Sequence, residues 1–318
     1  MQPDDPHYQE QAAAEAEFWS KPHPCSMEAM ETAREPEGPT EIYRNVRYTG
    51  DPRREWQETI AGHGTFRRGL VLGTSSLRVE GSILATNPSL HLTFLDISQG
   101  AVDRRAEVLG ARYPGRVATQ VADLNFVEFE PAQYDLIVSS SSLHHVTNVE
   151  HLAFQINRSL RPEGRFFLDD YVGEPRFQFS AEKRRVFELL YERDLARKPG
   201  RQTGLYWLDT TDLSPFCGLR SDETLDILAR YLTEIQVRPA ATLLVPLMRS
   251  RPLDYGTPKR IQFAAGMLRA LWNRCRGLAA PRIGIDPPFL NDLTLVGDVL
   301  SDAGLLRPGT AFAIYGRR

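Results

Sequence analysis

Short apolar runs alternate with stretches of helical periodicity through the middle of this chain. The runs occupy residues 70–72, 92–95, 117–121, 136–138 and 166–168. Between the last two runs, apolar side chains repeat at the spacing of one helix face, at Val149, Leu152, Ala153, Ile156 and Leu160. Such alternation of strand and helix is typical of a mostly parallel sheet whose two faces are covered by helices. The pattern therefore predicts an α/β fold.

The flanking segments are less regular and suggest additions to this core. We expect an N-terminal helical cap over 1–62, the core over 63–175, a helical insertion or lid over 176–285, and a closing helix and strand over 286–318. Residues 9–19 favour helix through their alanine and glutamate content. Further elements are expected as helices at 182–196, 222–232, 260–276 and 293–304, a candidate strand at 234–237 and a final strand at 311–315.

Composition narrows the class of protein. The chain has 318 residues, of which 42% are hydrophobic and 25% charged, with a formal net charge of −3. These values are ordinary for a globular protein, and the absence of long basic runs argues against a nucleic-acid partner. The polar, acidic N-terminus is neither a signal peptide nor a membrane span, so we expect a cytoplasmic protein. Cys25, Cys217 and Cys275 match neither a disulfide framework nor a zinc spacing, and no metal is predicted.

Three residues that suit ligand binding follow consecutive predicted strands. Gly73 follows the first run, Asp96 the second and Asp123 the third. Ligands of open parallel sheets bind beyond the carboxyl ends of the strands, so these residues are expected to converge. An aspartate about twenty residues after a glycine turn suits ribose hydroxyls. Aspartate is also common as a plain turn residue, but the register of both with Gly73 favours function.

The motifs resemble those of the class I S-adenosylmethionine-dependent methyltransferases. The resemblance covers roughly residues 65–172 and, more weakly, the closing strand. It is carried by Leu70-Val71-Leu72-Gly73, Phe94-Leu95-Asp96-Ile97-Ser98, Val121-Ala122-Asp123-Leu124-Asn125, Tyr134-Asp135-Leu136-Ile137-Val138, Leu143-His144-His145 and Leu160-Arg161-Pro162-Glu163-Gly164. In the last motif Glu163 replaces the first glycine of the family's pattern. The resemblance implies a Rossmann-like sheet of seven strands with helices on both faces.

The resemblance also implies a site for S-adenosyl-L-methionine. Its expected cofactor-binding residues are the turn Gly73, Thr74 and Ser75, the ribose-side pair Asp96 and Ile97, the adenine-side pair Asp123 and Leu124, and Ser140. The chain departs from the family at the turn, where glycine-x-glycine-x-glycine becomes Gly73-Thr74-Ser75-Ser76-Leu77. Side chains at a crowded turn weaken cofactor binding if they restrict the approach of the backbone.

His144 and His145 are the candidate catalytic bases, since imidazole titrates near neutral pH. Packing or capping roles in the loop are an equal alternative, and His145 is slightly preferred. Tyr171 is a further catalytic candidate that could orient a substrate. Arg176 and Trp19 are candidate substrate-binding residues, although an ion pair for Arg176 and simple packing for Trp19 are the more ordinary roles.

The resemblance implies transfer of a methyl group to an oxygen or nitrogen, less readily carbon, of a small molecule, in a setting such as specialised metabolism. Two alternatives stay open because the turn is poor in glycine: a methyltransferase-fold enzyme that catalyses cyclisation or rearrangement, and a non-catalytic binding protein. A homodimer is a further, weaker expectation. For the basic helix at 260–276 a solvated face is the ordinary alternative, and docking to an acidic carrier domain or a membrane surface is the weaker one.

Overall fold

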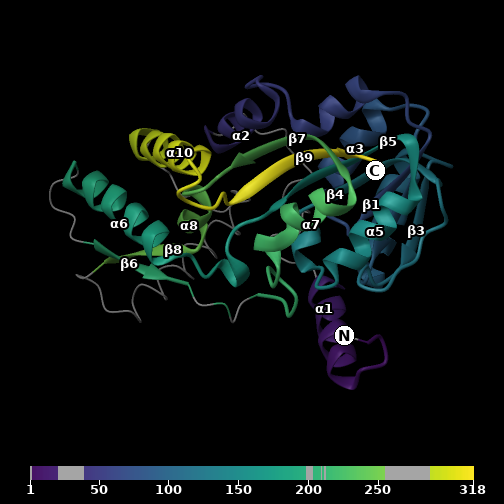
Figure 1. Ribbon diagram of the computed structural model, residues 1–318, viewed down its shortest axis with the longest axis horizontal. Helices are drawn as coiled ribbons and strands as arrows, with labels where there is room; N and C mark the ends of the chain where they lie inside the picture. Colours follow the sequence, from purple (N-terminus) through teal and green to yellow (C-terminus); the bar gives the residue numbers. More distant parts are fainter. Residues whose placement is uncertain (1, 21–38, 198–202, 209, 211–212, 255–286) are drawn as a thin grey trace, which may run out of the picture.

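The computed structural model describes residues 2–20, 39–197, 203–208, 210, 213–254 and 287–318 (Figure 1). Its centre is a seven-stranded sheet with the order β3-β2-β1-β4-β5-β9-β7. The strands are β1 (Arg68–Leu72), β2 (His91–Asp96), β3 (Val117–Val121), β4 (Tyr134–Ser140), β5 (Leu160–Tyr171), β7 (Thr233–Ala240) and β9 (Thr310–Gly316). The first five are mutually parallel, and β9 runs antiparallel to both of its neighbours. The predicted Rossmann-like, mostly parallel seven-stranded sheet is confirmed.

Alternate residues of the strands contribute their side chains to two separate hydrophobic layers, one on each face of the sheet. On β1, Val71 belongs to one layer, whereas Leu70 and Leu72 belong to the other. The first layer receives α3 (Leu77–Thr86) and Leu109 of α4 (Gln99–Arg112); the second receives α5 (Val149–Ser159) and α7 (Thr224–Tyr231). Side chains of successive strand residues point to opposite faces, so this division follows directly from the apolar runs. Helices on both faces are confirmed.

The segments outside the central strands pack against the helices and one face of the sheet or lie beyond one of its ends. The N-terminal helix α1 (Pro6–Ser20) packs on α4, while α2 (Pro39–Thr49) and the 3₁₀ helix η2 (Trp56–His63) pack on the first layer. At the far end in Figure 1, α6 (Ala181–Ala196), α8 (Leu244–Met248) and α10 (Pro287–Asp302) lie near a two-stranded sheet of β6 (Thr203–Trp207) and β8 (Ser250–Asp254).

The less regular segments match their predicted elements in part. The helix expected at 182–196 is α6, the helix expected at 222–232 is the short η5 (Ser221–Glu223) followed by α7, and the final strand is β9. The candidate strand at 234–237 is β7, which forms the edge of the main sheet, so the predicted lid segment also contributes to the core. The closing helix α10 begins six residues before the expected residue 293. The helix expected at 260–276 lies outside the described residues, and the predicted division into four segments stays a prediction.

Among the helices that the structure describes, none is both long and apolar enough to cross a bilayer.

Candidate active site at the carboxyl edge of the sheet

The turn after β1 is shaped around Gly73. This residue has φ of 70°, and a Cβ atom placed on it would lie 2.5 Å from the Cβ of Ser142. Its N–H donates to the carbonyl of Leu95 on β2 at 2.8 Å. Ser76 then begins α3 by accepting the N–H of Val79. Only glycine fits this turn without strain, both for its backbone angle and for the space available.

Thr74 and Ser75 continue the turn through contacts with buried carboxylates. Oδ2 of Asp96 accepts the N–H and the hydroxyl of Thr74, at 2.8 and 2.6 Å. The N–H of Ser75 donates to Glu80 at 2.8 Å, and Glu80 is paired with the buried Arg105 at 3.0 Å. The turn is therefore braced from inside the protein, and the Ser75 N–H is directed at Glu80.

Leu77, at the third glycine position of the family's pattern, is buried in the first hydrophobic layer at the start of α3. At this position a leucine side chain that packs between the helix and the sheet therefore stands in place of a conformationally free glycine.

The end of β3 is covered by α1. The Tyr8 hydroxyl donates to Asp123 at 2.5 Å and accepts from the amide of Asn125 at 2.9 Å. The Tyr8 ring stacks on Phe216 with ring centroids 5.5 Å apart. Burial, reinforced by the hydrogen bond to Asp123, holds the pKa of Tyr8 well above its usual range, so its hydroxyl keeps its proton.

The other cofactor-binding candidates also lie at this edge of the sheet. Ile97 is half-buried directly after β2, Leu124 is buried after β3, and Ser140 is the buried last residue of β4. The structure therefore brings all predicted cofactor-binding residues to the carboxyl ends of β1 to β4.

His144 is oriented by a carboxylate on β5. Its Nδ1 lies 2.5 Å from Oδ1 of Asp170. The other oxygen of Asp170 accepts the backbone N–H groups of Ser142, Leu143 and His144, which fixes the short helix η3 (Leu143–His145) against the strand. Burial opposes protonation, but the Asp170 carboxylate outweighs it and raises the pKa of His144 to about 10. His144 is consequently protonated near neutral pH.

His145 is oriented in the same way by a residue of α1. Its Nδ1 lies 2.8 Å from Glu15, which is 2% exposed. Glu15 also accepts the hydroxyl of Ser214 and the N–H of Phe216, at 2.8 and 2.9 Å. Burial raises the pKa of Glu15, but these hydrogen bonds, foremost that of His145, bring the pKa below its usual value. A charged carboxylate thus joins α1, η3 and the segment 214–218.

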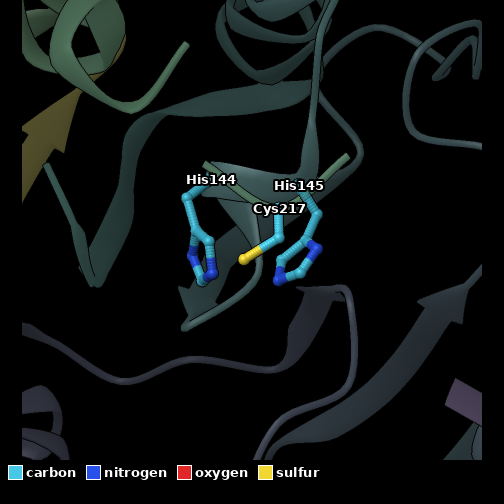
Figure 2. A group of neighbouring side chains, drawn as sticks. All are labelled: His144, His145 and Cys217. Atoms are coloured by element: carbon cyan, nitrogen blue, oxygen red, sulfur yellow. The ribbon is translucent and has the colours of Figure 1, made fainter. Parts of the chain in front are cut away.

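Cys217 completes the group. Figure 2 shows both imidazole rings directing a nitrogen toward its sulfur, and the three potential ligand atoms lie within 4.8 Å of one another. The Gly218 N–H donates to the His144 carbonyl at 2.8 Å, which holds the cysteine beside η3. Burial raises the pKa of the Cys217 thiol, but hydrogen bonds from His144 and His145 outweigh burial and lower the pKa to about 6.

Tyr171, Arg176 and Trp19 are the remaining predicted site residues. The Tyr171 hydroxyl donates to the Glu174 carbonyl at 2.7 Å, so its ring flanks His144 while its hydroxyl is used locally. The Arg176 guanidinium donates to the carbonyls of Ser214, Pro215 and Cys217. Trp19 meets the His145 ring edge-on with centroids 5.2 Å apart and donates to Glu15. Arg176 therefore holds the segment that carries Cys217, in place of the ion pair weighed from the sequence.

Sequence reasoning missed four residues of this group: Tyr8, Glu15, Asp170 and Cys217. Asp170 follows a predicted strand and could have been singled out as a partner for the histidines. Tyr8, Glu15 and Cys217 carry no local signal, because each is far along the chain from the residues it contacts.

Residues 70–166 match the profile of a family described as methyltransferase domain. The match to methyltransferases is thus carried by residues 70–166. A stretch of 93 residues of this chain is 31% identical to the 27-O-demethylrifamycin SV methyltransferase of Amycolatopsis mediterranei (strain S699). That match covers 29% of this chain and about a third (34%) of the relative's length.

Solved structures agree with this methyltransferase domain at the level of the fold. A geranyl diphosphate C-methyltransferase from Streptomyces coelicolor A3(2), solved with Mg²⁺, geranyl-S-thiolodiphosphate and S-adenosyl-L-homocysteine, aligns over 100% of both chains with a TM-score of 0.50 and 14% identity. A geranyl diphosphate methyltransferase in complex with GPP and sinefungin covers 97% of this chain and 100% of its own, with a TM-score of 0.50 and 13% identity. The family resemblance noted from the motifs is confirmed, and relatives of this fold bind S-adenosyl compounds.

Proposed function

We propose that this protein is an S-adenosyl-L-methionine-dependent methyltransferase that transfers a methyl group to an oxygen or nitrogen of a small molecule. The observation that carries the proposal is the meeting of Gly73, Asp96 and Asp123 at the ends of three adjacent parallel strands. This is where ligands of open α/β sheets bind. The match to the methyltransferase-domain family over residues 70–166 supports the same reading.

Asp96 is the residue we assign to the cofactor's ribose. Its carboxylate accepts two hydrogen bonds from Thr74 and one from the Ser98 N–H. A carboxylate offers about four lone-pair sites, so one acceptor site is left for a ribose hydroxyl. The N–H of Ser75 is not available to the cofactor in the same way, because it already donates to Glu80. We therefore do not assign the amino-acid end of the cofactor to this N–H.

The methyl acceptor is assigned to the space beside the two histidines. S-adenosyl-L-methionine, when bound, supplies an electrophilic methyl group on a sulfonium. His144 has a pKa raised to about 10 by Asp170 against the effect of burial, so it donates a proton rather than takes one near neutral pH. We assign His145, which Glu15 and Trp19 hold in place, to take the proton of an acceptor hydroxyl. Burial and the neighbouring His144 lower the pKa of His145, but hydrogen bonds with Cys217 and Glu15 outweigh them and raise it. Alignment of acceptor and methyl supplies much of the rate, about 7–11 kcal/mol in favourable cases.

Calorimetry with S-adenosyl-L-homocysteine tests the cofactor assignment. Asp96→Asn should weaken binding by about 10- to 100-fold, because a charge-assisted hydrogen bond contributes about 1.5–3 kcal/mol. Asp103→Asn, an exposed carboxylate on the neighbouring helix α4, is the matched control and should bind like the wild type. Equal affinities of wild type and Asp96→Asn would refute the ribose role.

A second candidate is a methyltransferase-fold protein that no longer methylates. It is favoured by the commitment of the Ser75 N–H to Glu80 and of Asp123 to Tyr8. Failure to bind the cofactor at millimolar concentration would favour a binding protein. Cofactor binding without transfer of a labelled methyl group to any tested hydroxyl or amine compound would favour a different reaction at the same site.

A further inference from the structure

We propose that His144, His145 and Cys217 form a binding site for a divalent transition metal of the zinc class. Their three potential ligand atoms lie within 4.8 Å of one another (Figure 2). In a tetrahedral site with bonds of about 2.0–2.3 Å, ligand atoms are about 3.5 Å apart. The group therefore needs only a small contraction to close around an ion.

The imidazole rings are already oriented as in metal sites. Nδ1 of His144 is bonded to Asp170 and Nδ1 of His145 to Glu15. This leaves Nε2 of each ring to face the sulfur. Histidine ligands of metals almost always give their other ring nitrogen to a carboxylate, a carbonyl or water, which fixes the ring and strengthens the ligand. Two such carboxylate–histidine pairs meeting at one sulfur is an arrangement that core packing does not require.

Cys217 is fixed at the same point by contacts of its own segment. The Gly218 N–H donates to the His144 carbonyl, and Arg176 donates to the Cys217 carbonyl at 3.3 Å. The donor set comes from η3 and from the segment 214–218, whereas Glu15 reaches it from α1. Because these elements are held by hydrogen bonds of the backbone and of Arg176, Asp170 and Glu15, the ligands are positioned before an ion arrives.

The donor set selects the class of metal. Two imidazoles and a thiolate suit zinc and similar ions, whereas Mg²⁺ and Ca²⁺ prefer oxygen ligands. Within the described residues the group offers three ligands, and three protein ligands with a fourth position for water or substrate are typical of catalytic zinc sites. Trp19 and Tyr171 flank the two rings.

The fourth coordination position of the metal would bind the hydroxyl that accepts the methyl group. This role of the metal rests on the proposed function. A metal held there would lower the pKa of a bound substrate hydroxyl, whose proton would pass to water. The oxygen's electron pair then forms a bond to the methyl carbon as the carbon–sulfur bond breaks, and the sulfur keeps the electron pair. In the loaded protein both histidines are ligands, so the metal replaces His145 in activating the acceptor.

Cobalt titration of the full chain, freed of metal by a chelator, tests the site. We expect about one Co²⁺ per chain, with thiolate-to-cobalt charge-transfer absorption and the strong visible bands of tetrahedral cobalt. Cys217→Ser should remove the charge-transfer band, whereas Cys275→Ser, the matched control, should keep it. Asp170→Asn should weaken cobalt binding by about 10- to 100-fold while keeping all three ligands. Azide should alter the visible spectrum by occupying the fourth position.

Each outcome decides the proposal. Absence of stoichiometric cobalt binding by the wild type, or a charge-transfer band that survives in Cys217→Ser, would overturn the site. A cobalt spectrum indifferent to azide would overturn the open position. The wild-type titration needs no variant to fold, and circular dichroism checks the variants. Calorimetry of S-adenosyl-L-homocysteine on the metal-free protein is independent, so the metal site and the methyltransferase function can fail separately.

Discussion

Gly73 is constrained twice, by its backbone and by its neighbour. Its φ of 70° is strained for other residues, and an added Cβ would collide with Ser142. We expect Gly73→Ala to lower the free energy of unfolding by about 1–3 kcal/mol, measured by denaturant titration. Gly110→Ala on α4 is the control: nothing lies within 4 Å of its Cβ position, and this change should stabilise by about 0.5–1 kcal/mol. Equal effects of the two changes would contradict the account of the turn.

Asp96 and Cys217 show what the sequence can and cannot predict about a site. Asp96 follows an apolar run and lies about twenty residues after a glycine turn, so the regularity of strand, turn and helix indicates its position. Cys217 lies beside His144 and His145 only because a segment much later in the sequence packs against η3. No spacing rule covers such a meeting, since it depends on tertiary packing of an irregular segment.

At the scale of elements, Arg176 couples the end of β5 to the segment 214–218. Its guanidinium donates to the carbonyls of Ser214 and Cys217. Arg176→Ala should loosen this segment and expose the buried thiol of Cys217, which would speed its alkylation by iodoacetamide about tenfold, as expected when local opening becomes easier by about 1.4 kcal/mol. Peptide mass spectrometry measures the rate at Cys217 specifically. Arg185→Ala, on an exposed face of α6, is the control; an unchanged rate in Arg176→Ala would argue against the coupling.

Asp135 pins the beginning of β1 to β4. Its Oδ2 accepts the N–H groups of Arg67 and Arg68, and Arg161 pairs with its other oxygen at 2.8 Å. Burial raises the pKa of Asp135, but the hydrogen bonds from Arg68, Arg67 and Arg161 together bring it below its usual value. The stabilisation is therefore present above the unfolded-state pKa of about 3.9 and is lost as the pH falls through the lower folded-state pKa.

Asp135→Asn should remove this dependence. We expect the variant to be less stable than the wild type at pH 7 by about 1–3 kcal/mol and to lose less stability on acidification. Denaturant titrations at pH 7 and near pH 3 measure both effects. A variant that loses stability with acid as steeply as the wild type would show that other groups govern the acid response.

The strands β1, β2 and β4 were predictable because each carries a short, largely buried apolar run, and burial on two faces requires such runs. The edge strand β7 was harder, since its pattern is mostly half-buried and exposed and the candidate 234–237 captured only its middle. The same burial logic explains α10: its first turn at Phe289 and Leu290 packs in the core, which the sequence pattern from residue 293 onward did not include.

At the scale of the whole molecule, α1 closes the carboxyl edge of the sheet. Tyr8 reaches Asp123 and Glu15 reaches His145, so a helix expected only as part of a cap contributes to both halves of the candidate site. Docking of this helix depends on a few buried polar contacts, which periodicity cannot reveal. The homodimer, carrier docking and cytoplasmic location expected from the sequence stay predictions.

A crystal structure of the protein with S-adenosyl-L-homocysteine tests the central claim most directly. The account predicts the adenosine over the turn at Gly73, a ribose hydroxyl within hydrogen-bond distance of Asp96, and the sulfur facing the space beside His144 and His145. A ligand bound elsewhere, or a carboxyl edge of β1 to β3 that stays empty at saturating concentration, would contradict it.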